Sequence, residues 1–118
     1  MNIKWEIEYY ATTAGKMPAK DFIEKLPLKL RAKTFRDIGL LEEFGITLNE
    51  PYSKHLKEGI YEIRVRLGKD QSRILYFFFR DQKIIMTNGF IKKTQKTPPG
   101  EIERALKYKA DYERRFSK

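Results

Sequence analysis

The sequence predicts an α+β fold, in which helical and strand-forming segments follow one another in blocks rather than in strict alternation. Three strand-like runs lie close together between positions 60 and 91, two helical patterns precede them, and one follows. The 118 residues are 41% hydrophobic and 14% aromatic, enough for one core and too few for two ordinary domains. Residues 1–118 should therefore form a single domain.

The first half of the chain predicts a strand followed by a helical hairpin. Apolar residues at 3, 5, 7 and 9 alternate with polar ones, which is typical of a half-buried strand. A helix should open at Met17 and Pro18 and run towards Leu26, where Pro27 must interrupt it. A second helix should run from Leu30 to Phe44 and end at Gly45. The two helices are expected to cover one face of a sheet.

The second half predicts a three-stranded antiparallel meander and a last helix. Residues 46–55 are expected to form a loop. Short connections join the expected strands, which are Ile60–Leu67, Gln71–Arg80 and Lys83–Ile91. The continuous apolar run around Phe77 favours a central strand that is covered on both faces. Thr97 is expected to cap the final helix, with Pro98 at its first position.

Positive charge is concentrated on this predicted sheet. The chain has 25 Lys and Arg against 16 Asp and Glu, and residues 54–96 alone hold 11 against 4. A localised basic surface favours a polyanionic partner such as nucleic acid, although solubility alone would also use such charge. The absence of cysteine excludes thiolate metal sites and fits a reducing cytoplasm. No secretion signal or apolar run long enough to span a membrane is expected.

The basic residues are spaced for binding phosphate. Arg64 and Arg66 emerge side by side on the polar face of one strand, about 6–7 Å apart, close to the spacing of successive phosphates. Arg73 begins the next strand and is expected to converge on the same site, with Lys92 and Lys93 following the last strand. The alternative is that these side chains are ordinary exposed residues, with Glu62 forming a surface ion pair to one arginine.

Other catalytic patterns are absent from the sequence. There is one histidine, His55, and no zinc spacing, phosphate-binding glycine loop or supported serine nucleophile. The general base stays open between a lysine whose pKa is depressed by neighbouring cations, His55, Tyr61 and Glu62. Further candidates for contacts with a nucleic-acid partner are the lysines that flank the strands, Lys54, Lys57, Lys69 and Lys96.

Several local motifs resemble one known family. They are Leu56-x-x-Gly59-Ile60-Tyr61-Glu62-Ile63-Arg64, Ser72-Arg73-Ile74-Leu75-Tyr76, Asn88-Gly89-Phe90-Ile91-Lys92-Lys93-Thr94, Thr97-Pro98 and Glu101-Ile102-x-x-Ala105. Their order over nearly the whole chain resembles the RelE/HigB superfamily of toxins, within the wider RelE/ParE superfamily, and most closely its phage-derived, Gp49-like HigB branch. The expected order of strand, helical hairpin, meander and trailing helix matches the layout of that family.

The resemblance implies a type II toxin that cleaves messenger RNA on the ribosome without a metal or cofactor. It also implies a cognate, HigA-like helix-turn-helix antitoxin, through which the complex would contact operator DNA. The family's basic positions fall on Arg64, Arg66, Arg73, and Lys92 or Lys93. A histidine or tyrosine near the end of the sheet often completes such sites, and Tyr108 of the last helix is the candidate for that role here.

Two other classes of function remain open at this point. The related ParE branch shares the fold and acts on DNA gyrase, but it does not use the basic strand positions for cleavage. A nucleic-acid-binding module without catalysis would use the same sheet only to dock on backbone phosphates.

Overall fold

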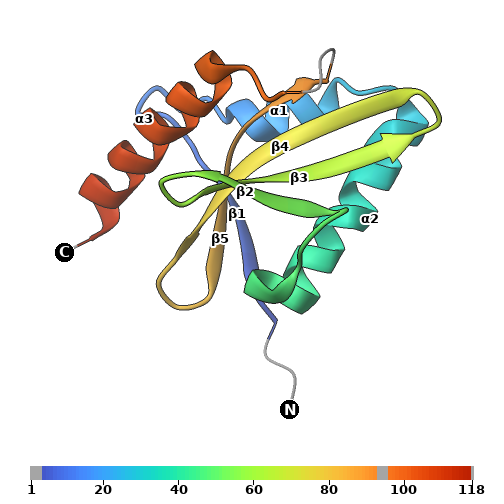
Figure 1. Ribbon diagram of the computed structural model, residues 1–118. Helices are drawn as coiled ribbons and strands as arrows, with labels where there is room; N and C mark the ends of the chain where they lie inside the picture. The colour runs from blue at the N-terminus through green and yellow to red at the C-terminus, as the bar shows by residue number, and fades with distance from the viewer. Residues whose placement is uncertain (1–3, 93–95, 118) are drawn as a thin grey trace.

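The computed structural model, which describes residues 4–92 and 96–117, is a five-stranded sheet with helices on both faces (Figure 1). The order of elements confirms the α+β prediction. They are β1 (Glu6–Tyr9), α1 (Pro18–Glu24), α2 (Leu28–Phe44), the 3₁₀ turn η1 (Gly45–Thr47), β2 (Ser53–Lys57), β3 (Ile60–Leu67), β4 (Asp70–Phe79), β5 (Lys83–Ile91) and α3 (Pro99–Phe116).

The strands lie in the order β1-β5-β4-β3-β2. β2 to β5 form an antiparallel meander, and β1 adds to its far side by pairing parallel to β5. β4 is therefore central, and its run from Ser72 to Phe77 is buried. This explains why β4 has a continuous apolar run instead of alternating residues.

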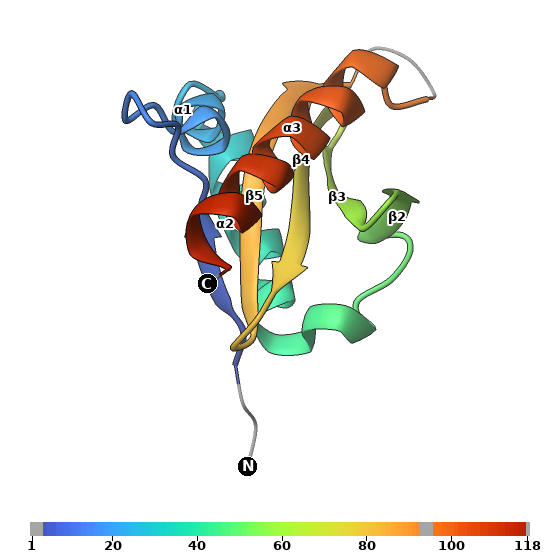
Figure 2. The ribbon, with the colours of Figure 1, turned by 90° about the vertical axis from the view of Figure 1, so that its left-hand side faces the viewer.

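One helical layer covers each face of the sheet: in Figure 2, α3 crosses in front of β4 and β5, and α2 lies behind them. Ile23 of α1 and Leu41 of α2 pack with Ile63 and Ile74 on one face. On the other face, Ala105 and Tyr112 of α3 pack with a second apolar group formed by Tyr10, Ile60, Leu75, Phe77 and Ile85. Alternation along β3 consequently turns Ile63 and Val65 towards α2, and Glu62, Arg64 and Arg66 towards the α3 face.

Three expectations about the elements were wrong. Ser53–His55, expected to end a loop, belong to the edge strand β2 (Ser53–Lys57), whose sequence is charged because an edge strand has little to bury. Thr97 does not cap α3, because its hydroxyl donates to Glu62 instead. Pro98 is the N-cap residue and Pro99 starts the helix, one position later than expected.

The N-terminal strand is shorter than expected. Pairing with β5 begins at Glu6, and the Trp5 amide donates to the Glu42 carbonyl at the end of α2. Ile3 lies outside the described residues. The indole of Trp5 packs edge-on against Phe78, with 5.2 Å between ring centroids, and it lies against Gly45. The helical hairpin is thus joined to the start of the sheet at this point.

The close approach at Gly45 makes a stability prediction. Gly45 has φ 53°, and an added Cβ would lie 1.9 Å from Trp5 Nε1. We expect Gly45→Ala to lower the free energy of unfolding by about 2 kcal/mol or more, from backbone strain and displacement of the indole. Gly39→Ala is the control, because nothing lies within 4 Å of its Cβ position in α2, and it should raise stability by up to about 1 kcal/mol. Urea unfolding measures both, and equal effects would contradict the packing argument.

Candidate functional site

Arg64 and Arg73 lie directly opposite each other on neighbouring strands. The register of β3 and β4 pairs their Cα atoms, and both side chains lie on the α3 face. Side chains in such a pair have Cβ atoms about 5 Å apart. Lys92 follows β5, where its amide donates to the Gln71 carbonyl at 3.0 Å. Sheet pairing therefore brings cations from three separate segments to one end of the sheet.

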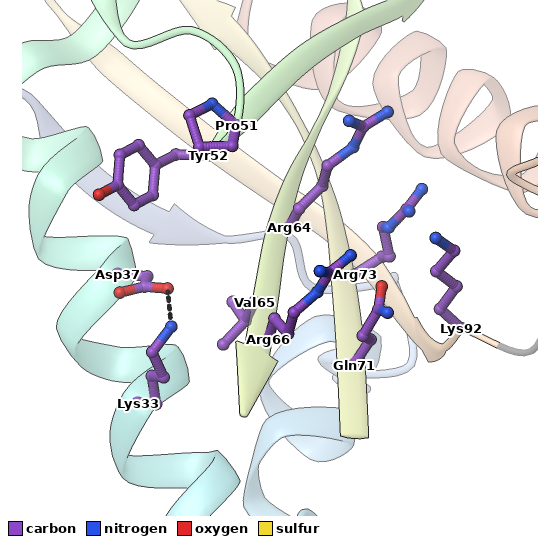
Figure 3. Close-up of a pocket in the computed structure, with 10 residues that line it drawn as sticks. All are labelled: Lys33, Asp37, Pro51, Tyr52, Arg64, Val65, Arg66, Gln71, Arg73 and Lys92. Carbon is purple, nitrogen blue, oxygen red and sulfur yellow. Dashed lines mark hydrogen bonds and ion pairs between the residues drawn. The ribbon is translucent and has the colours of Figure 1, made fainter. Parts of the chain in front are cut away.

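These cations line a cavity of about 480 Å³. On one side of β3 the cavity wall is formed by Arg64, Arg66, Gln71, Arg73 and Lys92 (Figure 3). On the other side, next to α2, it is formed by Lys33, Asp37, Pro51, Tyr52 and Val65. The cavity extends past the edge of β3 because β2 pairs with β3 only up to Ser53 and Ile63. We call the first side the arginine side and the second the α2 side.

A buried carboxylate holds the two opposed arginines in place. Glu62 is fully buried, and its Oε2 accepts from Arg64 Nε at 2.8 Å and from Arg73 Nη1 at 2.7 Å. Its Oε1 accepts from the Thr97 hydroxyl at 2.6 Å. The ion pair that the sequence suggested thus exists, but it is buried rather than at the surface. Because both carboxylate oxygens are engaged, Glu62 is placed to orient the arginines.

Charge and hydrogen bonds keep Glu62 ionised. Burial by itself would raise the pKa of its carboxyl group, but hydrogen bonds from Thr97 and Arg64, together with the charge and hydrogen bond of Arg73, hold the pKa below its ordinary value. A carboxylate with a lowered pKa is a weak proton acceptor. This makes Glu62 a poor general base.

Lys92 has the opposite electrostatic environment. Desolvation lowers the pKa of its ammonium group, and the charges of Arg73, Arg66 and Arg64 lower it further, while Glu62 acts weakly in the other direction. A lysine with a lowered pKa loses its proton more readily. Such a lowered pKa was expected, from the sequence, of any lysine that serves as the general base. Of the basic residues expected after β5, Lys93 lies outside the described residues.

Of the remaining candidate bases, Tyr61 and Tyr108 lie away from the arginine side, whereas His55 lies beside it. Tyr61 faces the α2 layer and packs against Tyr76 and Phe78. Tyr108 stacks on Tyr10, with ring centroids 4.6 Å apart, and does not line the cavity. His55 lines a smaller neighbouring pocket that also contacts Arg64 and Arg73, but its Nε2 accepts from the Gly59 amide at 3.3 Å.

The four flanking lysines are spread over the surface. Lys54 and Lys96 line the same smaller pocket as His55. Lys57 is exposed beside Glu58, and Lys69 is exposed in the turn between β3 and β4. Only two of these lysines therefore adjoin the arginines.

Sequence reasoning missed the α2 side of the cavity. Lys33 and Asp37 are one helical turn apart and form an ion pair with 3.4 Å between Nζ and Oδ2. Their i,i+4 spacing predicts the pair but not its position beside β3, which begins 23 residues after Asp37 in the chain. Tyr52 lies in the loop expected at residues 46–55. The sequence feature that could have pointed to it is an aromatic residue directly after Pro51.

The described residues contain neither a cluster suited to a metal ion nor a membrane-spanning helix. No cluster of three or more histidine, cysteine or acidic residues is arranged there to hold a metal ion. No helix within residues 4–92 and 96–117 is both long and apolar enough to cross a membrane.

The buried carboxylate generates a pH-dependent stability prediction. Removing the charge with Glu62→Gln leaves Arg73 as a buried, uncompensated cation, so we expect a loss of about 3 kcal/mol at neutral pH. Because the folded pKa of Glu62 is below its unfolded value, near 4.5, this contribution is present above that pH and is lost as pH falls through the folded pKa. The difference between wild type and variant should therefore shrink in acid.

Urea unfolding across a pH series measures this difference. Glu50→Gln is the matched control, because Glu50 lies 3.9 Å from the same Arg64 but its side chain is 64% exposed. An exposed pair of this kind contributes little to stability. Equal losses for Glu62→Gln and Glu50→Gln would contradict the role given to the buried carboxylate.

Comparison with known proteins identifies the family of the chain. No curated protein matches the chain. The family model described as "Phage derived protein Gp49-like (DUF891)" matches residues 21–110, a span that includes α2, all of the meander and the arginine side of the cavity. The match covers well over half of the chain, and the chain therefore belongs to the phage-derived Gp49-like family, a family of RelE/HigB-like toxins.

Proposed function

We propose that this protein is the toxin of a type II toxin–antitoxin pair and that it cleaves messenger RNA on the ribosome as a metal-independent endoribonuclease. The observation that carries the proposal is the convergence of Arg64, Arg66, Arg73 and Lys92 on one side of a single cavity. Four cations face one carboxylate there, so a surplus of positive charge remains for an anionic substrate. Membership of a toxin family supports the same conclusion.

The arginines bind the scissile phosphate. Arg73 is only 3% exposed, and its Nε is buried without a hydrogen-bond partner in the described part of the chain. A guanidinium binds a phosphate through two parallel hydrogen bonds, and donors fixed beforehand stabilise charge that develops in the transition state. Glu62 supplies that fixation. Arg66, which is exposed at the rim of the cavity, binds a flanking phosphate.

Lys92 is the proton acceptor in this scheme. It removes the proton of the ribose 2′-hydroxyl, whose oxygen then forms a bond to the adjacent phosphorus while the bond from phosphorus to the 5′-oxygen breaks. The products are a 2′,3′-cyclic phosphate and a 5′-hydroxyl, and water supplies the proton to the leaving oxygen. Arginine is a poor proton donor because its guanidinium group stays protonated in proteins. Arg64 and Arg73 therefore contribute charge stabilisation rather than proton transfer.

A second protein must restrain such an enzyme in the cell. We expect a cognate antitoxin of the HigA type, with a helix-turn-helix domain that brings the complex to operator DNA. Family membership supports an antitoxin partner.

Brief induction in growing cells tests the function. We expect messenger RNA to be cut within open reading frames before growth stops, and a cyclic phosphate to be present at the new 3′ ends. Arg66→Ala should reduce cleavage about 10- to 100-fold without loss of folding, because Arg66 is exposed. Lys20→Ala is the control for loss of one exposed positive charge, because Lys20 lies in α1 and does not line the cavity. Intact RNA with stalled replication would instead indicate a gyrase inhibitor, and neither effect would indicate a binding module.

The pH dependence of cleavage tests the role of Lys92. We expect Lys92→Ala to lower the cleavage rate about 10²- to 10⁴-fold. The wild-type rate should rise with pH up to the lowered pKa of Lys92 and then level off, because only the neutral amine accepts a proton. Lys92→Arg keeps the charge but removes this rise. A wild-type rise that persists in Lys92→Arg would assign proton transfer to another group.

A further inference from the structure

The α2 side of the cavity contains groups that phosphate chemistry does not use. Figure 3 shows Tyr52, Asp37 and Lys33 on this side of β3, with the arginines beyond the strand. A cavity of about 480 Å³ is in the range of small-molecule sites and is larger than one phosphate requires. The α2 side thus leaves room for another part of the substrate.

Asp37 has the wrong charge for binding phosphate. Its side chain is 7% exposed, and Oδ2 accepts from Lys33 Nζ at 3.4 Å. Within the described residues, only this one of its two oxygens is engaged. A carboxylate oxygen that borders a cationic cavity repels phosphate oxygens and attracts hydrogen-bond donors.

Tyr52 presents an aromatic ring on a fixed backbone. Its carbonyl accepts from the Arg64 amide at 2.7 Å, and its amide donates to the Asn49 carbonyl at 3.0 Å. The residue is nevertheless 42% exposed, so its ring is held at the rim of the cavity without being buried in the core. Exposed aromatic rings beside a cationic surface are a common platform for unpaired RNA bases.

We propose that the α2 side of the cavity is a nucleobase subsite that selects guanine beside the cleaved phosphate. The base stacks on Tyr52, its donor edge meets Asp37, and its phosphate lies on Arg64 and Arg73. This inference rests on the proposed ribonuclease function and adds substrate selection to it.

Hydrogen-bond chemistry distinguishes the bases at this subsite. Guanine presents two adjacent donors, N1–H and the N2 amino group, next to the O6 acceptor. That edge matches a carboxylate beside an ammonium group, because Asp37 accepts both donors and Lys33 donates to O6. Uracil fits worst, since its single imino donor lies between two carbonyl oxygens that the carboxylate would repel. Cytosine and adenine each offer an amino group but only one donor position.

Mapping of cleavage sites across cellular messenger RNA tests the role of Asp37. Sequencing of new 5′ ends after brief induction should show wild-type cuts enriched for guanine at one position beside the cut. Asp37→Asn should lower the preference for guanine over uracil at that position about tenfold, because the amide replaces one acceptor with a donor. Cleavage beside uracil should fall less than cleavage beside guanine, because only guanine loses a matched pair of acceptors. Glu43→Gln, an exposed position on the same helix, should keep the wild-type profile.

Substitution of Tyr52 tests stacking without disturbing the core. Tyr52→Ala should reduce cleavage about tenfold, whereas Tyr52→Phe should keep it because the ring, not the hydroxyl, carries the interaction. Phe44→Ala is the matched control, because Phe44 is 46% exposed and does not line the cavity.

The outcomes separate this inference from the proposed function. If the wild type cleaves RNA and the variants at Asp37 and Tyr52 keep its rate and base profile, the subsite is refuted while the function stands. Loss of antitoxin binding in these variants, with an unchanged base profile, also refutes the subsite. The edge of β3 would then be a binding site for a segment of the antitoxin. If the wild type cleaves no RNA, both proposals fall together.

Discussion

The arrangement of the site depends on the buried contact of Glu62 with Arg64 and Arg73. Two arginines directly opposite each other on neighbouring strands repel, and one of them is almost fully removed from water. The carboxylate offsets that repulsion and fixes both guanidinium groups by hydrogen bonds. Thr97 adds a bond from the segment before α3, so the position of the last helix is joined to the same cluster. Removal of this one charge would leave a buried cation without compensation.

The short edge strand β2 gives the site its second side. β2 pairs with β3 only as far as Ser53, so the end of β3 lies between the arginine side and α2 with no strand beyond it among the described residues. A longer β2 would have covered this edge. The cavity therefore combines a cationic wall, suited to phosphate, with a wall of different chemistry formed by Asp37 and Tyr52.

Periodicity in the sequence predicted the strands that have many buried residues and failed for the strand that has few. The limits predicted for β3 and β5 are those observed, because both strands have many buried residues and their pattern reflects that burial. β2 was missed, since a charged edge strand buries little and leaves no pattern. A local capping rule predicted that Thr97 caps α3. Its hydroxyl instead donates to Glu62, a buried acceptor 35 residues away in the sequence.

The sequence by itself determined the α+β class, the order of most elements and the shared face of Arg64 and Arg66, because alternation along a strand fixes which side chains share a face. It gave Arg73, and Lys92 or Lys93, as candidates for the same site. The tertiary structure alone decided how these residues divide their roles. The burial of a side chain and the number of its hydrogen-bond partners depend on residues from distant segments. For this reason Glu62, which could have formed a surface ion pair, is buried and holds both Arg64 and Arg73. The α2 side of the cavity was likewise invisible in the sequence, because helix packing sets it and no local pattern records that packing.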